Sequence, residues 1–464
     1  MFIKRRVLLF MKKYEMLPTE ENIIETLYND PINRNKDIVY FYNILQAQES
    51  ASAIAIDGRW GSGKTFFVRQ TKMVINALNS SSTIDEETKA KATVRLPFSK
   101  NDEENENYSI AVYYDAWEND NDTEPVLSLI YEITKQLSVD FSLSDISVVK
   151  TAGAIIEAIS GHNINGIKDA LTSEDPFKKF KEEKDVEQKI KDFFASILVE
   201  RGNRLIIFID ELDRCKPTFA VHLLEQIKHY IFDDRITFVF SINLEQLQHT
   251  IKQYYGADFD SCRYLDRFFD LRISMPPANM EKFYSEIGLE SRYYVDIVTK
   301  RIINMYNFEL REITRFYSQI KAAVYEPTHD SEKYDFMFPD GKGRQIILIY
   351  IVPLLIGLKI ADISKYDQFI NGHNSEPLKE LLDFDNDNRL LENMLNRDES
   401  FTKEEGKTLI TTDEMIDKFY NAIFVDQYDG RKYNTTLGQY EFTKESKGFA
   451  ISASSMLSRF AELS

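Results

Sequence analysis

The residues with the clearest chemical potential form the stretch D-G-R-W-G-S-G-K-T at positions 57–65. Within it, Gly58, Gly63, Lys64 and Thr65 satisfy the spacing G-x-x-x-x-G-K-[ST] of a phosphate-binding loop. Glycines allow positive φ and carry no Cβ, so successive backbone NH groups can converge on a phosphate, assisted by a helix amino terminus. The segment therefore predicts a site for a nucleoside triphosphate.

Two side chains of this loop have separate predicted roles. Lys64 would bridge the β and γ phosphates with its positive charge, and the Thr65 hydroxyl would ligate Mg²⁺. The alternative is a chance glycine turn, but the apolar run before the loop and the helical pattern after it favour nucleotide binding. The predicted nucleotide-binding residues of the loop are Gly58, Arg59, Trp60, Gly61, Ser62, Gly63, Lys64, Thr65 and Phe66.

A second informative segment, at residues 204–215, reads R-L-I-I-F-I-D-E-L-D-R-C. Its apolar run would place Asp210 at the carboxyl end of a strand, beside the phosphate loop, where it would hold Mg²⁺ through water. Glu211 would project to the other side and orient or deprotonate the water that attacks the γ phosphate. The alternative is that these acids only cap the next helix. Asp213 and Arg214 are predicted to form a structural ion pair.

Further sequence signals bear on which nucleotide would bind. The guanine-specific pattern N-K-x-D is absent, because the N-K-D at positions 35–37 has the wrong spacing, so ATP is favoured over GTP by elimination. Trp60 and Trp117 could stack on a base or on each other, although packing against the loop is the commoner role of such aromatics. The predicted cofactors are therefore ATP and Mg²⁺.

These motifs require a parallel sheet with helices between its strands. Apolar runs predict strands at residues 52–56, 108–117, 205–209, 236–242 and 271–274. Helical spacing predicts helices at residues 65–78, 126–137, 218–230 and 244–254. Nearly continuous apolar strands separated by helices are typical of a parallel sheet covered on both faces, so the predicted fold class is α/β.

Pro276 and Pro277 end this region, because paired prolines cannot continue a central strand. Beyond them the pattern is mainly helical, with helices predicted at residues 281–306 and 310–325. The predicted organisation is a basic extension at 1–17, a nucleotide-binding core at 18–277 with an insertion at 139–191, a helical lid at 278–365, and a carboxyl-terminal region of unknown role at 366–464.

Composition limits the partners and the compartment. The formal net charge of −18 repels polyanions, so nucleic acid could bind only through a local basic groove. Two cysteines, Cys215 and Cys262, cannot build a disulfide framework and fit a reducing cytoplasm. The most apolar stretch, at 346–358, is shorter than the ~20 residues a spanning helix needs. We therefore expect it to be a buried helix or strand, with no transmembrane segment.

Four segments carry a family resemblance. They are G-R-W-G-S-G-K-T, Y-D-A-W after the second predicted strand, I-D-E-L-D-R-C, and Y-L-D-R-F-F-D ahead of the paired prolines. In this order, over residues 19–325, they resemble the KAP family of P-loop NTPases. The resemblance implies an ATP-hydrolysing switch or motor with the strand order 5-1-4-3-2. Many members carry transmembrane helices between the two phosphate motifs, but residues 139–191 contain charged residues such as Glu157 and Lys168, so this chain resembles a soluble member.

The same resemblance suggests further site residues. Asn243 follows the fourth strand, where many members have Asp, and it can hydrogen-bond water or the γ phosphate as a sensor residue does in related ATPases. Arg267 lies where related ring ATPases present an arginine to a neighbour's nucleotide, and Arg263 is the competing choice. A surface salt bridge from Arg267 to Asp266 or Asp270 is the alternative.

Arg311 and Arg315 stand one turn apart in L-R-E-I-T-R-F and would share one face of a lid helix. From there they could contact the γ phosphate and link nucleotide state to domain closure. A plain helix face is the alternative.

Three hypotheses of function follow. The first is an ATPase whose cycle drives a conformational change, within a bacterial defence system against phage or plasmid; the defence role rests on the resemblance alone. The second is a nucleotide-gated scaffold that binds ATP with little hydrolysis. The third is a peripheral membrane adaptor that uses the basic segment at 4–13, although one weak amphipathic segment gives only reversible attachment. Expected partners are a second copy of the chain, which Arg267 acting in trans would require, or a defence-system protein.

Overall fold

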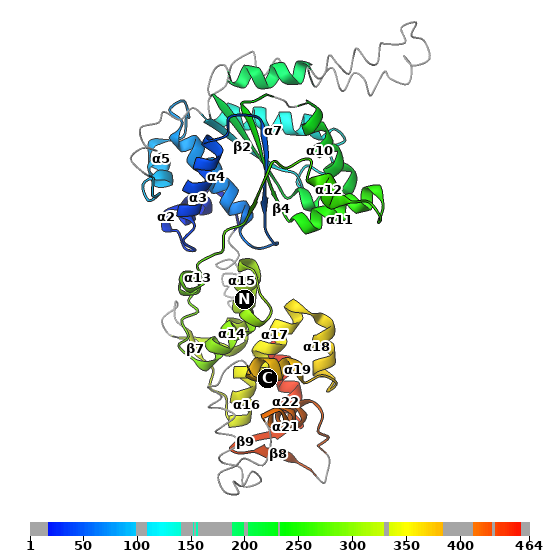
Figure 1. The fold of residues 1–464 in the computed structure, drawn as a ribbon. Coiled ribbons are helices and arrows are strands. Elements are labelled where there is room, and N and C mark those ends of the chain that lie inside the picture. The colour runs from blue at the N-terminus through cyan, green and yellow to red at the C-terminus, as the bar shows by residue number, and fades with distance from the viewer. Residues whose placement is uncertain are drawn as a thin grey trace, which may run out of the picture. The chain divides into compact units, whose positions relative to one another are not determined.

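The computed structural model describes residues 17–98, 109–140, 152, 155, 188–198, 203–230, 233–328, 334–383, 412–428 and 432–455. The chain forms two compact units that divide between Phe283 and Tyr284, and each is described by itself (Figure 1). Nearly all of the predicted extension at 1–17 and most of the predicted insertion at 139–191 lie outside the described residues. The predicted separation of a lid at 278–365 from a region at 366–464 stays a prediction.

The first unit is built on a five-stranded parallel sheet. Its strands are β1 (Ser52–Asp57), β2 (Ser109–Asp115), β3 (Arg204–Asp210), β4 (Ile236–Ile242) and β5 (Leu271–Ser274). They lie in the order β2-β3-β4-β1-β5, and each pairs in parallel with its neighbour. Counted from the other edge, this order is 5-1-4-3-2, so the predicted fold class and strand order are confirmed.

Both faces of the sheet are covered, because its strands are apolar on both sides. In β3, Ile206 and Phe208 belong to the core on one face, while Ile207 and Ile209 belong to the core on the other. The first face is covered by α2 (Glu20–Asn29), α3 (Asn35–Gln46), α4 (Lys64–Leu78) and α5 (Glu86–Thr93) (Figure 1). The second face is covered by α7 (Pro125–Asp140), α10 (Pro217–Tyr230), α11 (Leu244–Tyr255) and α12 (Ser261–Leu265).

The helices α2, α3 and α5 have no counterpart among the predicted elements. α3 nevertheless carries a regular apolar face, with Ile38, Phe41, Tyr42 and Leu45 all buried. This spacing is that of an amphipathic helix. α3 therefore contributes to the core that also holds β1 and α4.

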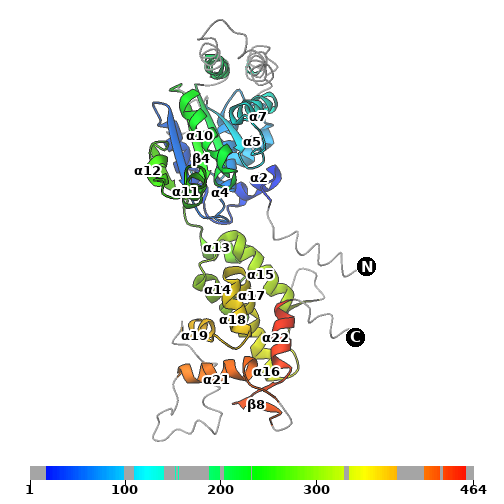
Figure 2. The same cartoon turned by 90° about the vertical axis from the view of Figure 1, so that its right-hand side faces the viewer.

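The second unit is mainly helical, as the pattern beyond the paired prolines predicts. Its described helices from Tyr294 on are α14 (Tyr294–Met305), α15 (Leu310–Val324), α16 (Lys342–Ile346), α17 (Val352–Ala361), α18 (Ile363–Ile370), α19 (Glu376–Asp383), α21 (Thr412–Phe424) and α22 (Ser446–Ser454). Two antiparallel strand pairs are added, β6 (Tyr325–Pro327) with β7 (Tyr334–Phe336) and β8 (Asn434–Leu437) with β9 (Tyr440–Thr443). Figure 2 shows α14, α15, α17 and α22 packed side by side.

The single helix predicted at 281–306 is wrong, because the chain forms two helices there, α13 (Met280–Glu286) and α14. Gly288 takes a φ of +75°, which lies in the left-handed region that ends helices. The NH of Leu289 then returns to the carbonyl oxygen of Tyr284 at 2.7 Å. Leu289 is fully buried, so the break places an apolar side chain in the core.

The segment predicted at 346–358 to be a buried helix or strand is helical. It lies within Lys342–Ala361, which consists of α16, a π-helical turn at Ile347–Ile351, and α17. Among the described residues this is the one helix long and apolar enough to cross a membrane, but most of its apolar window is buried inside the structure. A Cβ on Gly357 would lie only 2.6 Å from the Cγ2 of Ile302 in α14. Such close packing is typical of the core helix of a folded unit.

Candidate functional site

The predicted phosphate loop connects β1 to the amino terminus of α4. Gly61 and Gly63 take φ angles of +89° and +88°, a conformation that L side chains rarely adopt. Gly58 is required by space, because a Cβ there would lie 2.9 Å from the Cβ of Met275 and 3.0 Å from the Oγ of Ser62. The loop is therefore a close-fitting cradle at a helix amino terminus, which is a geometry that binds phosphate.

The ammonium group of Lys64 is folded back onto this loop. Its Nζ donates to the carbonyl oxygens of Gly58 at 2.5 Å and of Arg59 at 3.2 Å, and the residue is only 8% exposed. Burial lowers the pKa of Lys64, and the carboxylates of Asp213 and Asp210 oppose that shift. A buried cation whose hydrogen bonds go to neutral carbonyl oxygens gains from exchanging them for the oxygens of an anion.

Three strands of the sheet end in an acidic residue, and these strand ends lie at the same edge of the sheet. Asp57 ends β1, Asp115 ends β2 and Asp210 ends β3, and Asp115 is paired with Asp210 in the strand register. Asp210 is 1% exposed and accepts a hydrogen bond from the hydroxyl of Tyr113 at 3.0 Å. Burial raises the pKa of Tyr113, and the charge of Asp210 raises it further, so the phenol remains a donor that orients the carboxylate.

The residues at this edge fit a nucleotide with Mg²⁺. The Oγ atoms of Ser62 and Ser241 are buried and have no hydrogen-bond partner within the described parts of the chain. The hydroxyl of Thr65, in the first turn of α4, and the carboxylate of Asp210 are the oxygen donors that Mg²⁺ prefers. No group of three or more His, Cys, Asp or Glu side chains among the described residues could hold a metal ion alone.

Glu211 follows β3 with a φ of +59°, which is uncommon for a residue other than glycine. Its backbone NH donates to the carbonyl oxygen of Ser241 at 3.2 Å, and its Oε2 lies 2.7 Å from the Nη1 of Arg214. Burial raises the pKa of Glu211 to about 7, although the charge of Arg214 acts in the opposite direction. A carboxylate with such a pKa can accept and release a proton near neutral pH.

The predicted ion pair between Asp213 and Arg214 is wrong. Arg214 pairs with Glu211, and Asp213 accepts a hydrogen bond from the indole Nε1 of Trp60 at 2.6 Å. The reason is local geometry, because the residues after Glu211 form a 3₁₀ turn, η1 (Leu212–Arg214). At three residues per turn, positions i and i+3 share a face whereas adjacent residues do not.

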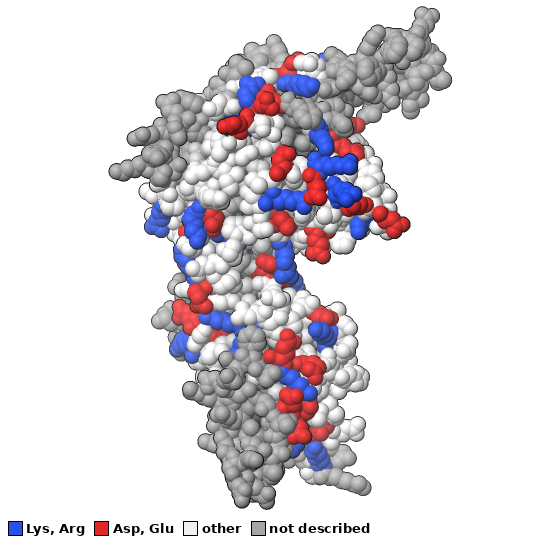
Figure 3. All heavy atoms as spheres, in the orientation of Figure 1, with Lys and Arg blue, Asp and Glu red and all other residues white. Residues whose placement is uncertain are grey.

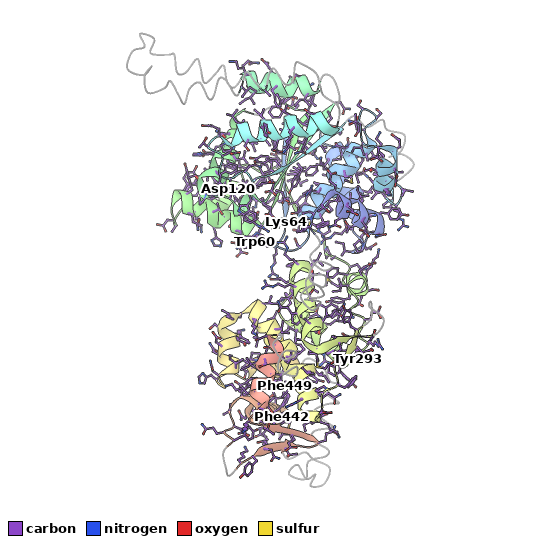
Figure 4. The ribbon with its side chains drawn as sticks, turned by 180° about the vertical axis from the view of Figure 1, so that it is seen from behind. Trp60, Lys64, Asp120, Tyr293, Phe442 and Phe449 are labelled. Carbon is purple, nitrogen blue, oxygen red and sulfur yellow. The ribbon has the colours of Figure 1, made fainter. Side chains whose placement is uncertain are left out.

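Trp60 and Trp117 flank Arg214. The guanidinium carbon of Arg214 lies 5.6 Å from the ring centroid of Trp60 and 5.4 Å from that of Trp117, within the range of cation–π interaction. Both rings are about half exposed, and Figure 4 shows Trp60 beside Lys64. Trp60 thus joins the phosphate loop to the turn after β3 through Asp213 and Arg214. The predicted stacking of Trp60 or Trp117 on a base stays a prediction.

The arginines predicted to complete the site lie on the surface. Arg263 in α12 and Arg267 in the turn after α12 are both exposed. The salt-bridge alternative for Arg267 is not found among the described residues, because Asp266 pairs with Arg272 at 2.5 Å and Asp270 accepts a backbone NH from β1. Arg263 instead has Asp260 within 3.9 Å. Whether either arginine reaches a neighbour's nucleotide stays a prediction.

Three other predicted residues are placed as follows. Asn243 caps α11, where its Oδ1 accepts the NH of Gln246 at 3.3 Å. Arg311 and Arg315 are exposed on one face of α15, in the second unit. The sensor role of Asn243 and the phosphate contacts of the two arginines stay predictions.

Comparison with known protein families gives a match to the model described as the KAP family P-loop domain, over residues 34–324. The chain belongs to the KAP family of P-loop NTPases. The match covers more than half of the chain and includes both phosphate motifs, so the resemblance drawn from the sequence is confirmed. A search of curated proteins found no match.

Two features of the KAP domain were not predicted from the sequence. The first is the hydrogen bond from Tyr113 to Asp210. Its signal was the alternation of β2, which places Tyr113 on the same face as Asp115, two residues later. The bond from Trp60 to Asp213 joins residues 153 positions apart, and no local pattern signals it.

Proposed function

We propose that the KAP domain binds ATP with Mg²⁺ and hydrolyses the nucleotide. The observation that carries this proposal is a buried cation, Lys64, at the amino terminus of α4, together with a buried carboxylate, Asp210, at the end of β3. Two buried opposite charges without a direct ion pair between them are costly unless a ligand or ion is bound between them. A Mg²⁺-bound triphosphate supplies both partners.

Each proposed role follows from the position of the side chain. Lys64 would leave the carbonyl oxygens of Gly58 and Arg59 for phosphate oxygens, because charge-assisted hydrogen bonds are stronger than those to neutral acceptors. Thr65 and Asp210 would hold Mg²⁺, which when bound draws negative charge from the phosphate oxygens. Tyr113 keeps the carboxylate of Asp210 in place.

Glu211 is the proposed acceptor for the proton of the attacking water. Its ion pair with Arg214 uses Oε2, which leaves Oε1 for the water. Arg214 is in turn held by the rings of Trp60 and Trp117, so the carboxylate has a fixed position. A positioned general base contributes roughly 10²- to 10⁴-fold to such reactions.

The test separates binding from hydrolysis. Titration calorimetry with ATP and Mg²⁺ should show binding for the wild type and for Glu211→Gln, and none for Lys64→Ala. Release of phosphate should fall at least about 100-fold in Glu211→Gln. Matched controls are Lys91→Ala on the surface of α5 and Glu245→Gln on the surface of α11, which should match the wild type. A wild type without binding would refute the function, and unchanged turnover in Glu211→Gln would refute the role of Glu211.

A nucleotide-gated scaffold is the second candidate function. The observation that favours it is the pairing of Glu211 with Arg214, which would slow proton transfer if the pair persisted with ATP bound. On this alternative, partner binding needs ATP and is unchanged in Glu211→Gln but lost in Lys64→Ala. The comparison of these two variants therefore separates a scaffold from a switch that requires turnover.

The biological setting is proposed from the family. We place the protein in the bacterial cytoplasm, as a nucleotide-driven switch in defence against phage or plasmid, acting as a homo-oligomer or with a defence partner. On the face drawn in Figure 3, the described Lys and Arg side chains are interspersed with Asp and Glu, so that face gives no support to nucleic acid as a partner. Mass in solution with and without ATP, for wild type and Arg267→Ala, tests assembly in trans. Phage plating efficiency on cells expressing the protein tests the defence role.

A further inference from the structure

Arg34 joins two parts of the first unit that are far apart in the sequence. It lies at the start of α3 and is 5% exposed. Its Nη1 donates to the carbonyl oxygen of Ser62 in the phosphate loop at 2.8 Å, and its Nη2 donates to the carbonyl oxygen of Pro276 at 2.7 Å. One guanidinium group therefore holds the phosphate loop and the segment after β5 at the same time.

The contact with Ser62 fixes one peptide group of the phosphate loop. A trans peptide is planar, with its carbonyl oxygen and its NH on opposite sides. With the carbonyl oxygen of Ser62 held by Arg34, the NH of Gly63 must point away from Arg34. Gly63 caps α4 with a φ of +88°, so this NH belongs to the group of amides at the helix amino terminus that bind phosphate.

The contact with Pro276 holds the segment at 275–279, through which the chain leaves the sheet toward the second unit. Two backbone bonds hold the same segment. The NH of Met275 donates to the carbonyl oxygen of Asp57 at 2.7 Å, and the NH of Asn279 donates to that of Ile32 at 3.0 Å. The segment is thus attached to the residue before the phosphate loop and to the turn that carries Arg34.

The turn that carries Arg34 is itself fixed. The Oδ1 of Asp30 accepts the backbone NH of Arg34 at 2.7 Å and that of Asn35 at 3.3 Å. The Nδ2 of Asn35 donates to the carbonyl oxygen of Leu27 at 2.9 Å. The backbone of Arg34 is therefore held in place, and its guanidinium group is shared by the carbonyl oxygens of Ser62 and Pro276. Displacement of one of these oxygens moves the guanidinium group and so affects its hydrogen bond to the other.

We infer that Arg34 is a positioning residue that orients the Ser62–Gly63 peptide for phosphate binding and couples occupancy of the phosphate loop to the segment at 275–279. The inference rests on the proposed nucleotide binding at residues 58–65. A bound triphosphate holds the amides of the loop, which fixes the Ser62 carbonyl oxygen, the Arg34 guanidinium and then the Pro276 carbonyl oxygen. Linkage requires the converse as well, so an intact segment at 275–279 strengthens nucleotide binding.

The test combines nucleotide affinity with hydrogen exchange of the amides of Met275 and Asn279. In the wild type, ATP with Mg²⁺ should slow exchange of both amides. Arg34→Ala should bind ATP about tenfold more weakly, because a charge-assisted hydrogen bond that orients the loop is lost. At saturating ATP, its two amides should no longer respond to the nucleotide.

Two further variants separate positioning from general stability. Arg34→Lys keeps a charge but not the planar fork, so it should regain part of the affinity without the exchange response. The control is Arg204→Ala, since Arg204 also joins two segments, donating to the carbonyl oxygen of Gln48 and to the Oγ1 of Thr237. It lies at the start of β3, whereas the phosphate motifs follow the strand ends. It should lower stability while the affinity and the exchange response stay as in the wild type.

The outcomes distinguish this inference from the proposed function. A wild type that binds no ATP removes the function and the inference together. Binding by the wild type without any slowing at Met275 and Asn279 overturns the coupling alone, and this measurement needs no variant to fold. Wild-type affinity and exchange response in Arg34→Ala, or the same losses in Arg204→Ala, would equally overturn it.

Discussion

Replacement of Trp60 by Phe tests how the phosphate loop is attached to the turn after β3. The indole Nε1 of Trp60 donates to Asp213 at 2.6 Å, and Asp213 is 6% exposed. A hydrogen bond to a charged group contributes about 1.5–3 kcal/mol. We expect the lower end, because Trp60 is 46% exposed and water can partly replace the indole. Phe keeps an aromatic face toward Arg214, so that cation–π contact costs at most about 0.5 kcal/mol more. The free energy of unfolding of the first unit should therefore fall by about 2 kcal/mol.

A double-mutant cycle with Asp213→Ala isolates the bond. The coupling between the two substitutions should be about 1.5 kcal/mol. Urea unfolding can be followed by tryptophan fluorescence, because both tryptophans of the chain, Trp60 and Trp117, lie in the first unit. Trp117→Phe is the control, since Trp117 contacts Arg214 without the bond to Asp213. A coupling below about 0.5 kcal/mol would refute the reasoning, because distant sites that share no interaction already deviate from additivity by that much.

Three other predictions concern stability. The hydrogen bond from Arg235 lowers the pKa of Asp233, so their pair stabilises the fold above the unfolded pKa and is lost as pH falls through the folded one. The free energy of urea unfolding should therefore differ between pH 7 and about pH 3 by a few tenths of a kcal/mol less in Asp233→Asn than in the wild type. The effect is small because the pair is partly exposed, and an unchanged pH difference would contradict the prediction. Gly343→Ala should destabilise the second unit by about 3 kcal/mol in calorimetry, because a Cβ would lie 1.9 Å from the carbonyl oxygen of Glu441. Gly448→Ala, in α22 with nothing within 4 Å of its Cβ, should instead stabilise that unit by up to about 1 kcal/mol, and equal effects of the two glycine substitutions would disprove this account.

The sheet was predictable because its strands are buried on both faces. The run at 205–209 is apolar without interruption, and such runs are hard to place anywhere but inside a covered parallel sheet. The end of α13 also has a local signal in the sequence, since Gly288 stands where a helix would stop. Local signals of this kind are present in the sequence itself.

Contacts between distant residues were not predictable in the same way. The partners of Arg34 lie 28 and 242 positions away, and only the folded chain brings them together. Arg214 pairs with Glu211, three residues before it, and not with the adjacent Asp213, because positions i and i+3 share a face of the 3₁₀ turn. Side-chain pairing at the site therefore depends on backbone details that residue types alone do not specify.

The positive φ of Glu211 is unfavourable for the backbone, while its side chain is the proposed general base. Glycine or asparagine would adopt this conformation more easily than glutamate. Random mutagenesis that selects only for heat resistance should therefore drift toward those residues at this position and discard the carboxylate. Glutamine leaves the unfavourable torsion in place, so it separates chemistry from conformational relief, whereas a glycine variant would confuse the two.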